Sequence, residues 1–310
     1  MNRPPLEELM KRIDEIQKTD LRASTIESIK EKLRLLFTGF IGSASHFERG
    51  TILHRGVPYK EKPKKLSELS YPPIEKAKMN RANRQGEQCF YCSGNRQVPF
   101  YELGLQPGDR IALSYWVTTE TLLFNSIGYT EENFKNLNAN RDHKWYEEVE
   151  PQEMLNEENK LVQNFLAKAF SQQIPNDKEE LKKLTIAIAE KHHSENIQEN
   201  DKNYAQFAGL FYPTIKMNAN ADNFAIKKSV VDHGSLIFKE VEYIEIKSVA
   251  GAKYNVDVLD WANSISDDGL IEWKGRVPQW TFYDDEHYYI TIEDGRQVAR
   301  NLDGEIIEPH

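Results

Sequence analysis

Apolar side chains recur at helical spacing over the first 38 residues of the chain. They fall every three or four residues in two runs, which consist of Leu6, Leu9, Met10, Ile13 and Ile16, and of Ile26, Ile29, Leu33, Leu36 and Phe37. This period puts one apolar stripe on each of two amphipathic helices. Ser24 and Thr25 offer an N-cap to the second helix, and Gly39 offers a stop. We therefore predict a helical extension over residues 1–45.

Short apolar runs separated by turn residues predict strands farther along the chain. Strands are expected at 50–57, 88–93, 110–118, 207–215, 223–231 and 236–249, and helices at 74–82, 98–105, 153–173 and 177–193. Residues 249–310 are rich in strand and turn patterns, and the Asn-Leu-Asp-Gly sequence at 301–304 is typical of a hairpin turn. Strands followed by helices and then by strands again predict an α+β fold rather than a doubly wound sheet.

Composition places the chain among folded proteins. Its 310 residues are enough for one large domain with additions or for two domains, and 29% charged with 39% hydrophobic residues suits a globular protein. There is no run of about 18 apolar residues, so no membrane span is predicted. The first residues are charged and lack the apolar core of a secretory signal, which makes the cytoplasm the expected compartment.

Charge argues against one class of partner. The net charge of −9 lacks the basic footprint that nucleic-acid binding requires, so no nucleic-acid partner is predicted. Residues 1–90 are nevertheless basic, with 18 Lys and Arg against 12 Asp and Glu. This third could meet a phosphate-bearing small molecule or an acidic partner. The alternative is that Lys60, Lys62, Lys64 and Lys65 belong to a solvated loop.

Two cysteines, Cys89 and Cys92, form a single CxxC pattern. One such pair cannot make a four-cysteine zinc site, and a redox CxxC normally begins a helix. Here the run Cys-Phe-Tyr-Cys is typical of a strand, in which positions i and i+3 point to opposite faces. We therefore predict two buried structural thiols and no metal site.

The segment 69–102 carries the most informative combination of side chains. It places Arg81, Tyr91 and Glu102 within 22 residues, separated by turn and strand patterns. An arginine, an aromatic ring and a carboxylate are what a site needs if it holds an anionic ligand with aromatic groups and stabilises positive charge on it.

These residues belong to an ordered set of motifs. The chain contains LHRGV at 53–57, ELSYPP at 68–73, RANRQG at 81–86, FYCS at 90–93, FYELGLQPGD at 100–109, YPT at 212–214 and NFAI at 223–226. In this order the motifs resemble the RES-domain family, which is named for a recurring Arg, Glu and Ser. The resemblance covers roughly residues 50–248, and glycine signatures of the Rossmann or P-loop type are absent.

The resemblance implies an ADP-ribosyltransferase-like fold, with a mixed β core and flanking helices. It implies a RES domain over residues 46–248, preceded by the extension 1–45 and followed by a β-rich extension over 249–310. RES proteins include toxins that consume NAD+ by hydrolysis or phosphorolysis or that ADP-ribosylate a target, and many are paired with an antitoxin. NAD+ is therefore the expected substrate, with no cofactor, and an antitoxin or immunity protein is an expected partner.

The resemblance also implies roles for individual residues. Arg81, Tyr91 and Glu102 match the family's catalytic positions, and the NAD+-binding positions fall on Arg55, Tyr71, Asn83, Thr214 and Asn223. Thr214 stands where the family has its serine, so the hydroxyl is kept while a methyl group is added.

The residue types suit this chemistry. Arginine offers a planar fork to pyrophosphate oxygens. Cleavage of the nicotinamide–ribose bond passes through an oxocarbenium-like state, which the carboxylate of Glu102 could stabilise without a metal. Two alternatives stay open: an ADP-ribosyltransferase acting on a protein, and a non-catalytic nucleotide-binding or interaction module. Homo-oligomers are compatible with each, and restraint of a toxin would come from an antitoxin or from occlusion by residues 1–45.

Overall fold

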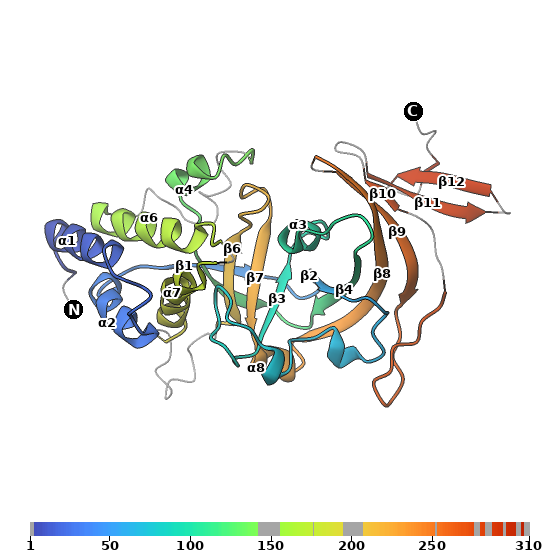
Figure 1. Cartoon of the computed structure of the whole chain (residues 1–310), viewed down its shortest axis with the longest axis horizontal. Coiled ribbons are helices and arrows are strands. Elements are labelled where there is room, and N and C mark those ends of the chain that lie inside the picture. Colours follow the sequence, from blue (N-terminus) through green and yellow to red (C-terminus); the bar gives the residue numbers. More distant parts are fainter. Residues whose placement is uncertain are drawn as a thin grey trace. The chain divides into compact units, whose positions relative to one another are not determined.

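A computed structural model of the chain shows an α+β protein, as the order of patterns predicts (Figure 1). The structure describes residues 3–141, 156–175, 177–194, 207–251, 253–275, 280–282, 287–293, 296–301 and 305–306. The chain divides into two compact units. Unit 1 consists of Met1–Thr51, Tyr71–Gly94 and Thr118–Leu236, and unit 2 of Ile52–Ser70, Asn95–Val117 and Ile237–His310.

The first two helices of unit 1 lie where the two apolar stripes predict helices. They are α1 (Leu6–Gln17) and α2 (Ile26–Phe37). The side-chain oxygen of Thr25 accepts a hydrogen bond from the Ser28 amide at 3.1 Å, so Thr25 is the N-cap that the sequence offers. Gly39 lies just beyond α2 with a φ of +66°, the left-handed conformation that glycine adopts most readily.

Two longer helices and the short helix α4 (Glu131–Asn136) also belong to unit 1. The two longer helices are α6 (Glu157–Ser171) and α7 (Lys182–Ser194), the latter preceded by the short 3-10 turn η4 (Glu179–Leu181). The helices share one apolar core with residues of the sheet, which includes Leu9, Ile13, Leu33, Leu36, Phe165, Phe170, Ile188, Leu210 and Ala225. The helices of the predicted extension are therefore part of the core of unit 1 and not an appendage to it.

The sheet of unit 1 has the order β1-β5-β6-β7-β3. Its strands are β1 (Ser43–Phe47), β5 (Leu122–Ser126), β6 (Gly209–Pro213), β7 (Asp222–Lys227) and β3 (Cys89–Ser93). β5 and β6 run parallel, and the other neighbouring pairs are antiparallel. Side chains alternate between the faces: Leu210 and Tyr212 join the core shared with the helices, while Phe211 packs against Phe224, with ring centroids 5.0 Å apart.

Unit 2 has strands in the order β2-β4-β8-β9-β10-β11-β12. They are β2 (Ile52–Pro58), β4 (Arg110–Thr118), β8 (Leu236–Ala250), β9 (Lys253–Ala262), β10 (Trp280–Phe282), β11 (His287–Glu293) and β12 (Arg296–Asn301). β8 and β9 form a long curved antiparallel ribbon (Figure 1). Its inner residues Ile244, Ile246, Val256 and Val258 pack with Ile111 and Leu113 of β4.

A short helix, α3 (Val98–Leu103), packs on β2 in unit 2. The contact depends on Gly56, because a Cβ built there would lie 2.5 Å from Cβ of Pro99 and 2.6 Å from Cδ1 of Ile111. Only glycine leaves room for the helix at this distance. The bare backbone of Gly56 thus fixes where α3 lies on β2.

The basic loop between β2 and the 3-10 turn η1 (Leu66–Glu68) is part of unit 2 and is anchored there to β9 and to Trp273. Lys62 pairs with Asp260 of β9, and its ammonium lies 5.3 Å from the centroid of the Trp273 ring. The indole nitrogen of Trp273 donates to the Pro63 carbonyl at 2.9 Å. The prediction of a solvated loop holds for Lys60, Lys64 and Lys65, which are exposed, whereas Lys62 is tied to the ribbon.

Several predicted elements differ from those observed. The helix predicted over 74–82 is only the 3-10 turn η2 (Ile74–Lys76), because the next residues fold into a turn held by the side chain of Asn83. The strand predicted over 223–231 ends at Lys227 and continues as the helix α8 (Lys228–Asp232). The hairpin predicted at 301–304 lies largely outside the described residues.

Two further sequence predictions can be compared with the structure. Cys89 and Cys92 are both buried, as predicted, and are not joined in a disulfide; Cys89 belongs to the core beneath the helices. The two compact units divide the chain at other points than the boundaries predicted at 45/46 and 248/249. Across the described residues, the helices are too short or too polar to cross a membrane.

Candidate functional site

The residues that the sequence singles out fall in both units. Unit 1 holds Tyr71, Arg81, Asn83, Tyr91, Thr214 and Asn223, and unit 2 holds Arg55 and Glu102. Within unit 1 the structure brings Arg81, Asn83 and Tyr91 into one turn and the strand that follows it.

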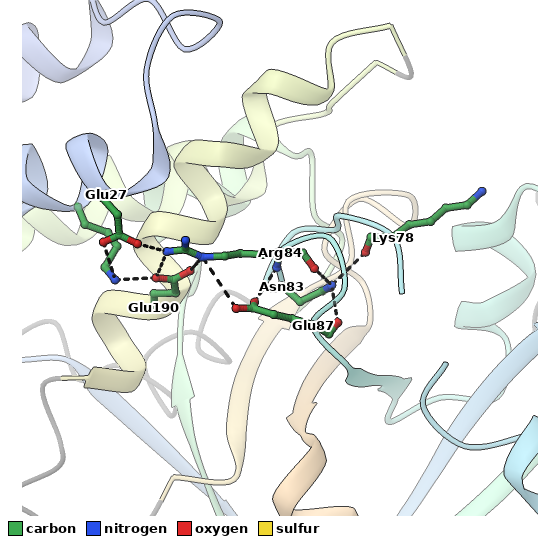
Figure 2. A network of polar contacts seen from close by, with 7 residues as sticks. Glu27, Lys78, Asn83, Arg84, Glu87 and Glu190 are labelled. Atoms are coloured by element: carbon green, nitrogen blue, oxygen red, sulfur yellow. Dashed lines mark hydrogen bonds and ion pairs between the residues drawn. The ribbon is translucent and has the colours of Figure 1, made fainter. Parts of the chain in front are cut away.

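Residues 78–87 form a turn, called here the motif turn, that Asn83 holds from inside. Its side-chain amide nitrogen donates to the carbonyls of Lys78, Arg84 and Glu87 at 3.0, 2.8 and 2.9 Å (Figure 2). Asn83 is only 5% exposed, so these bonds form away from water. Gly86 has a φ of +82° and donates its amide to the Ala77 carbonyl at 2.8 Å. Asparagine and glycine at these places explain why the sequence turns here.

Tyr91 ties the motif turn to β3. Its hydroxyl donates to the side-chain oxygen of Asn83 at 2.8 Å and accepts from the Ala82 amide at 3.0 Å. Burial is the main cause that raises the pKa of Tyr91 well above its ordinary value. The phenol therefore stays neutral at physiological pH, acting as donor and acceptor at once.

Arg81 lies at the carboxyl end of α6. Its guanidinium donates to the carbonyls of Phe170 and Gln172, the latter at 3.2 Å. The guanidinium carbon lies 5.7 Å from the centroid of the Phe170 ring. The last carbonyls of a helix lack partners within the helix, so Arg81 satisfies two groups that would otherwise need water. The fork that the sequence assigns to a phosphate is engaged here by α6.

Arg84 is a charged residue of the motif turn that sequence reasoning did not select. It binds the Glu190 carboxylate of α7 through Nε and through Nη2, the latter at 2.7 Å, and its Nη2 also binds Glu27 of α2 (Figure 2). The hydrogen bond to Glu190 is the main cause that raises the pKa of Arg84. The only sequence signal for Arg84 was its place as the second arginine of the six-residue motif RANRQG. Its partners Glu27 and Glu190 lie 57 and 106 positions away in the chain, so the motif does not reveal them.

Thr214 and Asn223 flank the turn between β6 and β7. Thr214 is fully buried, its amide donates to the Ala221 carbonyl at 2.8 Å, and its carbonyl accepts from the Ala219 amide at 2.7 Å. Among the residues that the structure describes, its hydroxyl oxygen has no hydrogen-bond partner. Asn223 lies in β7 between Tyr212 of β6 and Ser93 of β3. The buried hydroxyl is the polar group here that a bound ligand could satisfy.

Beside Asn223 lies an ion pair that the sequence did not reveal. Asp222 receives two hydrogen bonds from the Arg141 guanidinium at 3.0 and 2.8 Å, and one from the Tyr129 hydroxyl at 2.8 Å. The pKa of Asp222 is raised, because the effect of burial outweighs the opposite effect of the Arg141 guanidinium. Such a fork-on-carboxylate pair holds the start of β7 in place.

Tyr71 lies beside α8, at the edge of unit 1. Its hydroxyl donates to Asp232, and the Lys228 ammonium lies 5.1 Å from the centroid of its ring. The hydrogen bond to Asp232 is the main cause that raises the pKa of Tyr71. No described contact joins Tyr71 to Arg81, Asn83 or Tyr91, so the structure does not gather it with the motif turn.

In unit 2, Arg55 and Glu102 lie on neighbouring elements. Nε of Arg55 in β2 donates to the carbonyls of Leu69 and Ser70, each at 3.1 Å. Glu102 lies on the exposed face of α3, the helix that Gly56 admits next to Arg55. The arginine thus holds the end of the 58–70 loop, and Glu102 is an exposed residue of α3.

Unit 2 also contains a buried carboxylate that sequence reasoning missed. Glu242 of β8 is bound by Arg96 at 2.5 Å and by the Tyr115 hydroxyl at 2.8 Å. Burial is the main cause that raises the pKa of Glu242, although Arg96 opposes it. The Tyr115 ring packs edge-on against His54, with centroids 4.9 Å apart. A glutamate within an alternating strand pattern carries no sequence signal for this cluster.

The arrangement gathers Arg81, Asn83 and Tyr91 in unit 1 and leaves Glu102 as an exposed residue of α3 in unit 2. Among the residues that the structure describes, no three His, Cys, Asp or Glu side chains group in a way that could hold a metal ion. Comparison with protein-family models, with curated proteins and with solved structures finds no match to this chain.

Proposed function

We propose that the chain binds NAD+ and cleaves its nicotinamide–ribosyl bond, by hydrolysis or phosphorolysis, on an ADP-ribosyltransferase-like β core. One observation carries the proposal. Asn83 and Tyr91, which match the RES motif, bond directly to each other, and Tyr91 also binds the amide of Ala82, next to Arg81. The spacing of the motif thus corresponds to one hydrogen-bonded unit of turn and strand that includes the residue next to Arg81.

In this proposal Arg81 of unit 1 contacts the pyrophosphate. A guanidinium binds phosphate oxygens more strongly than it binds neutral carbonyls, because the acceptor is charged. NAD+ would therefore compete with the carbonyls of Phe170 and Gln172 for Arg81. The remaining polar contacts and the stacking surface come from other residues of unit 1. These are the neutral phenol of Tyr91, the side chains of Asn83, Asn223 and Tyr71, and the buried hydroxyl of Thr214.

Glu102 is the proposed catalytic carboxylate. Water or phosphate attacks C1′ of the nicotinamide ribose, the bond to the ring nitrogen breaks, and neutral nicotinamide leaves with the bonding electrons. The products are ADP-ribose, or its 1-phosphate, and a proton from the attacking group. A carboxylate near C1′ stabilises the developing positive charge and orients the nucleophile.

The test is NAD+ turnover by the purified chain, read by chromatography of products, with and without phosphate. Loss of NAD+ in the wild type but not in Glu102→Ala supports the proposal, and the product distinguishes hydrolysis from phosphorolysis. Glu61→Ala, which changes an exposed glutamate of the same unit, is the matched control. Intact NAD+ in every condition counts against an NAD+-cleaving enzyme.

A second candidate is a nucleotide-binding module without turnover. Two observations favour it: the guanidinium of Arg81 is engaged by α6, and Glu102 is exposed. NAD+ binding measured by calorimetry, unchanged in Glu102→Ala and without turnover in the wild type, would select this candidate. Label transferred from NAD+ to an added protein fraction would instead select an ADP-ribosyltransferase.

A further inference from the structure

We infer that Arg84 is a positioning residue that makes helices α2 and α7 the support of the NAD+-binding motif turn. The identity of the ligand, NAD+, rests on the proposed function. The positioning role of Arg84 rests on contacts within unit 1. It assigns residues 1–45 a role opposite to occlusion. The N-terminal helices hold the turn in its binding conformation.

The first step is the attachment of the turn to α7. Nη2 of Arg84 lies 2.7 Å from one carboxylate oxygen of Glu190, and Nε binds the other oxygen. Two parallel bonds from one fork fix direction as well as distance, which a lysine cannot do. The side chains are only 32% and 21% exposed, so solvent screens this pair less than a surface pair.

The second step is the attachment to α2. Arg84 also binds Glu27 (Figure 2). Lys30, on the next turn of α2, binds Glu190 at 2.7 Å and Glu27 at 3.3 Å. Two cations and two carboxylates therefore alternate around one point where the turn meets both helices. Burial alone would raise the pKa of Glu190, but hydrogen bonds from Arg84 and Lys30 outweigh it and lower the pKa.

The third step links Arg84 to the residues of the proposed site. The Arg84 carbonyl accepts from the side-chain amide of Asn83 at 2.8 Å, and the Arg84 amide donates to the Glu87 carboxylate at 2.8 Å. Asn83 in turn accepts from the Tyr91 hydroxyl. Releasing the Arg84 side chain thus loosens the same turn that presents Arg81.

The experiment compares Arg84→Ala, Arg84→Lys and Glu190→Gln with the wild type in the full chain. Steady-state kinetics with NAD+ are measured together with hydrogen exchange of the backbone amides of residues 78–87. Arg84→Ala should raise KM for NAD+ by about tenfold and leave kcat within about twofold. Arg84→Lys should recover part of the affinity, because it keeps the charge and loses the fork. Exchange should become faster in residues 78–87.

The matched control is Arg34→Ala, which breaks the exposed pair with Glu31 on the same helix α2, where both side chains are about 70% exposed. It should change neither KM nor exchange. Wild-type KM and wild-type exchange in Arg84→Ala overturn the inference. Faster exchange throughout unit 1, together with a lower kcat and a lower melting temperature, overturns it as well. That combination would mean that Arg84 stabilises unit 1 as a whole and does not position the motif turn. If the wild type consumes no NAD+, the proposed function fails, and exchange at residues 78–87 alone decides the role of Arg84.

Discussion

The hydroxyl of Tyr91 lies 2.8 Å from the side-chain oxygen of Asn83, and the same hydroxyl accepts the amide of Ala82 at 3.0 Å. Strand and turn are thus joined through one neutral phenol. Tyr91 lies nine positions after Ala82, so this bond closes the loop that contains Gly86. The integrity of the motif turn can be tested at this one oxygen.

Tyr91→Phe removes that oxygen and nothing else. It leaves the Asn83 oxygen and the Ala82 amide without this partner, in a place where burial is deep. We expect a loss of about 1–3 kcal/mol in the free energy of unfolding, measured in urea. Tyr59→Phe, which loses one bond from an exposed hydroxyl to the Glu68 carbonyl, is the control and should cost less. Equal costs would contradict a special role for Tyr91.

Gly56→Ala should displace α3. The new Cβ would lie 2.5 Å from Pro99 and 2.6 Å from Ile111, so the helix that carries Glu102 must shift. Overpacking of this kind costs about 1–3 kcal/mol, and a misplaced carboxylate should also lower NAD+ turnover. Gly94→Ala is the control, because the new Cβ would lie 3.7 Å from the Phe224 ring, at ordinary van der Waals distance. A fully stable and fully active Gly56→Ala would show that the position of α3 does not matter.

Glu190 should stabilise unit 1 at neutral pH. Its pKa in the folded state is below the ordinary value of 4.5, so its contribution is present above that value and is lost as pH falls through the lower, folded pKa. Glu190→Gln should therefore unfold at lower urea concentration than the wild type near neutral pH, with the difference shrinking under acid. A difference that stays constant from about pH 7 to about pH 3 would contradict this.

Glu242 should show the opposite pH dependence in unit 2. Burial raises its folded pKa above the ordinary 4.5, so its contribution is fully present below 4.5 and is lost as pH rises through the folded pKa. The free energy of unfolding of the wild type, minus that of Glu242→Gln, should fall with rising pH over that window. Urea unfolding at a series of pH values measures it, and a difference that rises instead would reverse the assignment.

The parts of the fold that the sequence predicted correctly depend on local patterns. The stripes of α1 and α2 and the Thr25 cap need no distant partner, and the residues of β3 and β4 alternate or cluster over a few positions. The helix predicted over 74–82 was wrong because the side chain of Asn83 offers the backbone a turn instead. Intrinsic strand preference likewise did not keep β7 extended beyond Lys227.

The candidate site was only partly predictable for the same reason. Motif order identified Arg81, Asn83 and Tyr91, and two of these three bond to each other. The partners of Arg81 and Arg84 lie far along the chain, at Phe170 and at Glu190, so no local pattern records them. Tertiary contacts decide whether an arginine faces a ligand or a helix end, and these contacts follow from packing rather than from spacing.

Arg81 provides the sharpest test of how helix capping and ligand binding share one side chain. Arg81→Ala removes the bonds to the carbonyls of Phe170 and Gln172 as well as the proposed pyrophosphate contact. The capping loss should cost about 1 kcal/mol of unfolding free energy, and affinity for NAD+ should fall by about tenfold or more, because a charge-assisted bond is lost. Arg81→Lys keeps the charge without the fork and should show a smaller loss of affinity. Calorimetric titration with NAD+ beside urea unfolding separates the two effects, and unchanged affinity with reduced stability would mean that Arg81 serves α6 alone.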